Sequence, residues 1–140
     1  MASTASNLYS RKSVQNASRN NFPVAAATRI FLNALVGLNA GVARPLQKGD
    51  KFGGLCLSEI DNRDGAAGDL SVETEFGSVA IVPVAGLTGH QDFQRVVYAS
   101  DDNTLTLTAA DNVAVGVISR YESSTHAAVR FFTEVEAALA

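Results

Sequence analysis

The residues best suited to catalysis are few and widely spaced in this 140-residue chain. His90 lies in a polar stretch that contains glycine, His126 precedes an apolar run, and Cys56 is the single cysteine. These positions do not give the clustered Cys and His pairs of a zinc site. Cys56 stands between two leucines, as a small buried apolar residue does, and the histidines are typical of solvated loops. We therefore predict no enzyme activity, and a hydrolase that uses His90 or Cys56 stays open as an alternative.

Acidic residues cluster in a few places, one of which has spacing that would suit a metal ion. Asp61, Asp64 and Asp69 lie in the glycine-containing stretch DNRDGAAGD. This stretch lacks the ligand order and the closing glutamate of an EF-hand, so an ordinary polar loop is the preferred interpretation. Glu73 and Glu75 are two residues apart and so lie on one face of a strand. The chain has no P-loop motif for phosphate binding, and we predict no metal and no cofactor.

Charge is divided unevenly along the chain. Residues 1–49 hold six basic and no acidic residues, whereas residues 50–140 hold five basic and all fourteen acidic residues. This asymmetry indicates that the first part contacts something negative, which is nucleic acid, an acidic protein surface or a neighbouring subunit. The alternative is that it pairs with the acidic part of its own chain. The net charge of −9 after residue 49 argues against nucleic-acid binding by that part.

The pattern of apolar residues divides the chain into an N-terminal arm, residues 1–21, and a domain, residues 22–140. The N-terminal arm is rich in Ser, Asn and Ala and shows no period of 2 or 3.6, so it is not expected to fold by itself. Leu8 and Tyr9 suit anchors that bury against another surface. From Phe22 onward, short apolar runs alternate with turn residues, which predicts a mainly β fold, either a small β-sandwich or a β-barrel.

Two segments of the domain are less regular. Residues 24–38 contain enough Ala and Leu for a helix, but they also contain β-branched residues, and Gly37 and Gly41 oppose one continuous helix. We prefer one or two strands with a turn at 39–41. Thr133 and Glu136 have the spacing of a capping box, which predicts a short C-terminal helical turn that persists only when packed on the body. The apolar stretch 30–38 is too short to span a membrane.

Several short motifs follow one another in the C-terminal half of the chain. They are Val-Tyr at 97–98, Asp-Asp-Asn at 101–103, a Thr-rich alternation at 105–108, Val-Gly-Val-Ile at 115–118 and Ala-Val-Arg-Phe at 128–131. Together with a Lys-Gly-Asp turn at 48–50, this series resembles the small capsid decoration, or cement, proteins of tailed bacteriophages. The resemblance covers residues 40–132, and the basic N-terminal arm and residues 22–38 depart from the shortest members of that family.

The resemblance implies a structural protein that is assembled in the host cytoplasm and binds the outer surface of the virion. Family members commonly act as homotrimers that stiffen the shell by clamping neighbouring subunits of the major capsid protein, without direct contact to nucleic acid or membrane. The alternative function is a small β-barrel that binds a ligand or a host carbohydrate, for which Phe93 and Tyr121 are the best aromatic candidates. The residues predicted to contact the capsid or a neighbouring copy are Leu8, Tyr9, Arg11, Lys12, Arg19 and Arg29.

Overall fold

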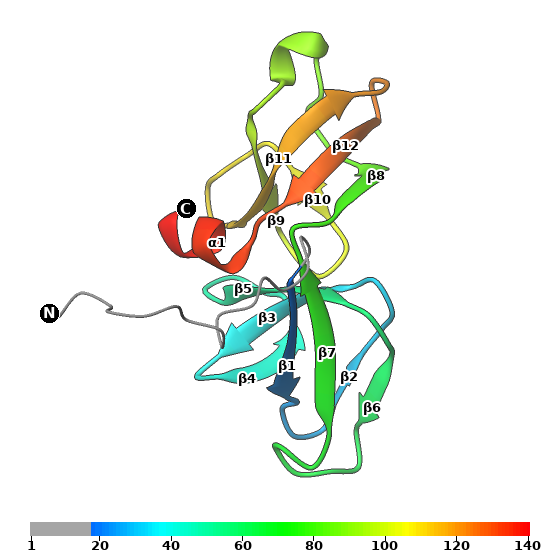
Figure 1. Ribbon diagram of the computed structural model, residues 1–140, viewed down its shortest axis with the longest axis vertical. Helices are drawn as coiled ribbons and strands as arrows, with labels where there is room; N and C mark the ends of the chain where they lie inside the picture. Colours follow the sequence, from blue (N-terminus) through cyan, green and yellow to red (C-terminus); the bar gives the residue numbers. More distant parts are fainter. Residues whose placement is uncertain (1–17) are drawn as a thin grey trace, which may run out of the picture.

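The computed structural model describes residues 18–140, and it confirms the mainly β fold (Figure 1). The first of its two five-stranded sheets has the order β1-β7-β5-β3-β4, and every neighbouring pair is antiparallel. Strands β2 (Thr28–Ile30) and β6 (Ile60–Asn62) form a separate two-stranded ribbon. The strands of the first sheet are β1 (Ser18–Pro23), β3 (Leu35–Asn39), β4 (Val42–Pro45), β5 (Lys51–Cys56) and β7 (Ser71–Phe76).

The second sheet lies above the first along the long axis of the molecule in Figure 1 and has the order β10-β9-β11-β12-β8. A 3₁₀ turn, η1 (His90–Asp92), lies at its far end, and helix α1 (Glu134–Leu139) follows its last strand. Strands β9 and β10 pair as an antiparallel hairpin around residues 101–103, although β10 is only two residues long. The strands are β8 (Val79–Pro83), β9 (Val96–Ala99), β10 (Leu105–Thr106), β11 (Val113–Tyr121) and β12 (His126–Phe131).

Each sheet curls until its own two edge strands approach each other. Val24, directly after β1, forms a parallel bridge with Ala43 of β4, so the first sheet wraps around a core of its own. In the second sheet, Ala85 forms a parallel bridge with Thr106 of β10, two residues after the end of β8. Each bridge joins the two edge strands of a sheet near one end. Each sheet is therefore a barrel that closes only in part.

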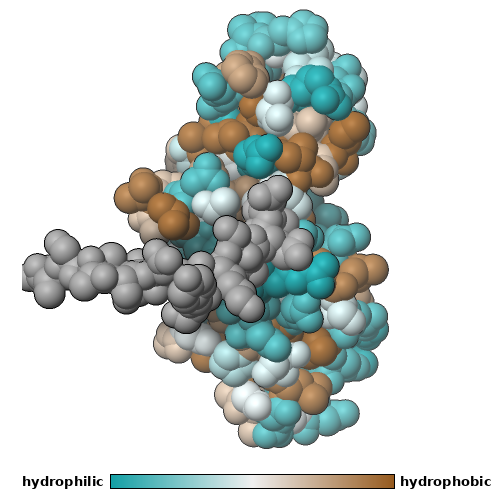
Figure 2. Space-filling view, in the orientation of Figure 1, coloured by the Kyte–Doolittle hydropathy of each residue, from teal (hydrophilic) through white to brown (hydrophobic). Residues whose placement is uncertain are grey.

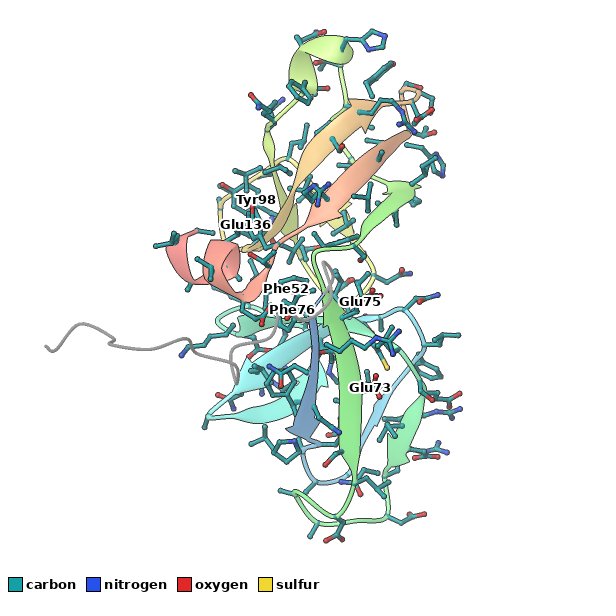
Figure 3. All side chains as sticks on the ribbon, in the orientation of Figure 1. Phe52, Glu73, Glu75, Phe76, Tyr98 and Glu136 are labelled. Carbon is teal, nitrogen blue, oxygen red and sulfur yellow. The ribbon has the colours of Figure 1, made fainter. Side chains whose placement is uncertain are left out.

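The two sheets share the larger of two hydrophobic cores. Phe52 of β5 packs edge to face on Phe76 of β7, with ring centroids 5.8 Å apart, and lies 6.4 Å from the ring of Phe131 in β12. Figure 3 shows Phe52 and Phe76 at the junction between the sheets. Leu35 and Leu46 from the first sheet region belong to the same core as Val115 and Ile118 in β11. The sheets are thus held together by continuous apolar packing rather than by a linker.

Local sequence explains the elements in the segments that were less regular. Residues 24–38 form β2 and β3, and the turn predicted at 39–41 joins β3 to β4. Ala40 (φ 52°) and Gly41 (φ 81°) are both left-handed, which is the geometry of a two-residue hairpin turn that matches the twist of the strands. In β7 the residues alternate between exposed and buried, so Glu73 and Glu75 share one face as predicted.

The C-terminal helix has the capping box that Thr133 and Glu136 predict. The Thr133 hydroxyl accepts the amide of Glu136 at 3.3 Å, and the Glu136 carboxylate accepts the amide of Thr133 at 3.0 Å. Ala137 packs against the larger core, which supplies the support that so short a helix requires. Val135, on the outer face, is 68% exposed. No helix within residues 18–140 is long and apolar enough to cross a membrane.

The first sheet starts earlier than the predicted domain boundary at Phe22. Strand β1 pairs with β7 from Ser18 opposite Phe76 to Pro23 opposite Ser71, so residues 18–21 belong to the sheet and not to the arm. Their polar side chains lower strand propensity, but the open edge of β7 supplies the backbone partners and overrides that preference. Residues 1–17, with the predicted contacts Leu8, Tyr9, Arg11 and Lys12, lie outside the described residues.

Candidate protein interface

The basic residues of the N-terminal part that the structure describes pair with acidic residues later in the same chain. The pairs are Arg19 with Glu73 (3.4 Å), Arg29 with Glu59, Arg44 with Asp50 (2.6 Å) and Lys48 with Asp111 (2.9 Å). Pairing within the chain therefore accounts for the charge asymmetry at these four positions. Arg19 and Arg29, predicted as capsid contacts, are engaged with their own body through exposed pairs, each of which is worth at most about 1 kcal/mol.

The Arg44–Asp50 pair is structural. The Asp50 side chain is 1% exposed, accepts both Nε and Nη2 of Arg44, and also accepts the amide of Gln47 at 3.2 Å. Its hydrogen bond to Arg44 raises the pKa of that guanidinium. A Cβ atom on Gly37 would lie 2.2 Å from Asp50 Oδ2, so only glycine leaves room for this carboxylate. The pair fixes the turn between β4 and β5.

Arg29 also contacts a small exposed apolar surface. Its guanidinium carbon lies 4.6 Å from the centroid of the Phe31 ring, which is cation–π geometry. Phe31 is 52% exposed and its neighbour Leu32 is 57% exposed. The sequence interpretation did not single out these two residues because they lie in the apolar segment 24–38, whose pattern is ambiguous between helix and strand. The available signal was Asn33, a left-handed residue (φ 64°) that turns the chain just before β3.

A groove of about 330 Å³ opens between the two sheets on the side of β8. The two edge strands of the second sheet, β8 and β10, meet at the Ala85–Thr106 bridge and diverge away from it. We call the gap between them the seam, and the groove lies in it. Asn33, which directly follows Phe31 and Leu32, is part of its wall. We call this cavity the lateral groove, and its main lining residues are Leu35, Leu55, Ile81, Asp102, Leu105 and Phe131.

Strand β8 forms an exposed edge of the lateral groove. Ile81 is 58% exposed and Val79 is also exposed, and Figure 2 shows hydrophobic side chains gathered over this part of the second sheet. The Val84 amide donates to Thr125 and Ser78 accepts from Phe131, so the even-numbered positions of β8 face β12. Backbone groups alternate along an antiparallel strand, and those of Val79 and Ile81 therefore face away from the sheet.

Two adjacent carboxylates give the lateral groove a negative rim. Asp102 lines the groove, and burial, followed by repulsion from Asp101, raises its pKa. Asp101 accepts the Asn103 amide at 2.9 Å, which lowers its own pKa. Within residues 18–140, neither carboxylate forms an ion pair with a basic side chain. The groove thus combines apolar walls, an open strand edge and uncompensated negative charge.

The structure does not bring the candidate catalytic residues together. Cys56 is buried in β5, where burial raises the pKa of its thiol and the thiol donates to the Ser58 carbonyl at 3.1 Å. His90 lies in η1 at the far end of the second sheet and packs on Tyr121, with ring centroids 5.0 Å apart. His126 contacts the Thr125 hydroxyl at 2.8 Å. In the described part of the chain, no three His, Cys, Asp or Glu side chains converge on a possible metal position.

The 61–69 loop is organised by its own hydrogen bonds. Asp61 pairs with Arg63 at 2.7 Å, and this contact lowers the pKa of Asp61 to about 2. Asp69 accepts the Ala66 amide at 2.9 Å. The buried Asn62 side chain donates to the carbonyls of Ala25 and Ala66. Two of the three candidate calcium ligands are therefore used within the loop.

Asp92 organises the loop at the far end of the second sheet. Its buried carboxylate accepts the amides of Thr88 at 2.6 Å and Gly89 at 3.2 Å, the Thr88 hydroxyl, and Arg95 at 3.1 Å. These hydrogen bonds lower the pKa of Asp92 to about 2, although burial acts to raise it. The hydrogen bond from the Thr88 amide is the main cause, followed by those from Gly89, Arg95 and the Thr88 hydroxyl. The nearby Phe93 is 56% exposed.

Replacement of Asp92 should change how stability depends on pH. A carboxylate whose pKa is lowered by folding contributes stability above its ordinary pKa and loses it as pH falls toward about 2. We expect Asp92→Asn to lower the melting temperature at pH 7 and to flatten the loss of stability between pH 5 and about pH 2. Thermal unfolding across that range measures both effects. Unchanged pH dependence would show that the Asp92 contacts do not contribute to folding.

Comparisons with protein-family models, with curated proteins and with solved structures find no match to this chain. No relative therefore supplies a function or a set of site residues.

Proposed function

We propose that this chain is a viral structural protein, a decoration or cement protein that binds the outer surface of a phage head and clamps neighbouring major capsid subunits. The observation that supports a binding role is the exposed apolar pair Phe31 and Leu32, which directly precedes Asn33 in the wall of the lateral groove. Apolar residues gathered beside a groove are typical of protein interfaces. The assignment to capsids in particular comes from the resemblance of residues 40–132 to cement proteins.

The body suits a clamp because it resists deformation. The two curled sheets share one core through Phe52, Phe76 and Phe131, so a load on one sheet is passed directly to the other. A close-packed interior transmits strain rather than absorbing it. A homotrimer that engages three equivalent capsid sites would add avidity without any new contact. These properties fit a protein that stiffens a symmetric shell.

Serine substitutions at the Phe31–Leu32 surface test this proposal. The double variant Phe31→Ser/Leu32→Ser should bind purified heads that lack decoration protein at least tenfold more weakly, equivalent to about 1.4 kcal/mol. The matched control is Val135→Ser/Leu139→Ser, which removes exposed apolar side chains from α1. Co-sedimentation across a range of protein concentrations measures the affinities. If the full-length protein does not sediment with heads, the cement function is wrong.

A carbohydrate- or ligand-binding module is the second candidate. The observation in its favour is Phe93, which is exposed beside the His90–Tyr121 pair in the loop held by Asp92. An exposed aromatic ring is a suitable platform for a sugar. Titration of the protein with host glycans, with Phe93→Ala as the comparison, distinguishes the two functions. Glycan binding that depends on Phe93, together with no binding to heads, would favour this second candidate.

A further inference from the structure

Strand β8 is less protected than the other sheet edges. Natural edge strands carry charges or prolines, are very short, or are covered, because an open edge pairs readily with another strand. In the first sheet, β1 carries Arg19 and β4 carries Arg44, and these two edges approach each other at the Val24–Ala43 bridge. In the second sheet, β10 has only two residues. Strand β8, with the sequence VAIVP, has five residues and no charge, and its one proline stands at the last position.

The shape of the seam fits an extended peptide. A strand added to β8 would accept and donate hydrogen bonds at Val79 and Ile81, whose backbone groups face away from β12. The lateral groove beside it has room for one or two large side chains between Leu35, Leu55 and Phe131. Strand addition of this kind gains affinity from the backbone and selectivity from the side-chain pocket. The ligand should therefore be a strand with a large apolar residue on the face that meets the groove.

The charge at the rim restricts the ligand further, because Asp101 and Asp102 favour a basic partner. Residues 1–17 of this chain contain two charged residues, Arg11 and Lys12, both basic, directly after Leu8, Tyr9 and one serine. We infer that the lateral groove and the edge of β8 bind residues 8–12 of a second copy of this chain. This inference rests on the proposed cement function, in which several copies lie side by side on a shell.

The described chain begins beside a cavity other than the lateral groove. The Ser18 hydroxyl donates to Glu134 of α1 at 3.0 Å, beside a different cavity that Asn20, Phe22 and Glu134 line. That cavity contains Leu38 and Phe52, whereas the lateral groove contains Leu35 and Leu55, so the two cavities lie at opposite ends of β3 and β5. Residues 9–18 span at most about 30 Å when extended. The second copy follows from the proposed cement function, which places several copies side by side.

Photo-cross-linking on the full chain tests the inference. Tyr9 is replaced by the photoreactive p-benzoylphenylalanine, and equal amounts of ¹⁴N- and ¹⁵N-labelled protein are mixed, assembled on heads and irradiated. We expect cross-links from position 9 to residues 79–83 or 101–105, with both isotopes in one cross-linked peptide pair. Cross-links that join only peptides of the same isotope would assign the groove to its own chain. Cross-links elsewhere, or none, would overturn the inference.

A positive charge introduced at the edge gives the matched comparison. Ile81→Lys places a cation beside the expected position of Arg11 and Lys12, and it should reduce mixed-isotope cross-links at least tenfold. Val135→Lys, at a similarly exposed position on α1, should leave them unchanged. Head binding is measured on the same samples. Normal sedimentation with no groove cross-link would reject this inference alone, whereas loss of sedimentation in the unsubstituted protein would reject the cement function.

Discussion

Removal of residues 1–17 should leave the domain folded and reduce retention on purified heads at least tenfold. The described domain begins at Ser18, so a chain that starts there keeps every strand and both cores. It loses Leu8, Tyr9, Arg11 and Lys12, which are the predicted anchors and basic contacts. Co-sedimentation measures retention, and circular dichroism confirms the fold. Unchanged retention would show that these residues do not contribute to binding.

Removal of residues 1–21 is the informative contrast, because it also removes most of β1. Residues 18–21 pair with residues 73–76 of β7, and each lost backbone hydrogen bond costs about 1 kcal/mol. The free energy of unfolding should therefore fall by about 2–4 kcal/mol relative to the chain that starts at Ser18. A deletion at residue 21 would thus mix two effects, weaker binding and weaker folding. Equal stability of the two truncated chains would contradict the assignment of β1.

The Phe52→Ala variant should be strongly destabilised, because this ring joins the two sheets. Phe52 is 6% exposed and contacts the rings of Phe76 in the first sheet and Phe131 in the second. Removal of a buried phenylalanine ring costs about 3–5 kcal/mol, which is a large part of the stability of a small domain. Urea unfolding followed by both fluorescence and circular dichroism measures the loss.

The control for this substitution is Phe93→Ala, which removes an exposed ring and should change stability by less than about 0.5 kcal/mol. A second result of the same experiment concerns the shared core. If Phe52 links the two sheets, both probes should report one transition in the unsubstituted protein. Two separate transitions before any substitution would show that the sheets unfold independently.

The alternation of apolar and polar residues was sufficient to predict the mainly β fold and most strand positions. It works in β7 because one face of that strand is buried, so side chains with a period of two must alternate in polarity. Capping and turn chemistry are equally local, which is why Thr133, Glu136 and the turn before Val42 were predictable. The start of β1 was not, because its polar residues form a strand only through pairing with the distant β7.

The candidate interface was less predictable for the same reason. The lateral groove depends on how two sheets approach each other, and no local pattern encodes the distance between Leu35 and Ile81. Charge composition indicated a contact for Arg19 and Arg29 but did not identify the partner, which is Glu73 or Glu59 of the same chain. Exposed Phe31 and Leu32 lie in the apolar segment 24–38, whose pattern is ambiguous between helix and strand. Long-range geometry decides the first two, whereas the exposure of Phe31 and Leu32 follows from the local turn at Asn33.

The bridge between Ala85 and Thr106 limits what the open edge can become. It closes the seam at one end, and Pro83, just before it, has no amide hydrogen to donate. Within β8, only the backbone amides of Val79 and Ile81 can donate hydrogen bonds to an added strand. The edge can therefore pair with only one short strand. An unprotected edge without such a stop would template sheet after sheet. The bridge and Pro83 therefore limit strand addition at this edge to one short segment and do not let the sheet grow further.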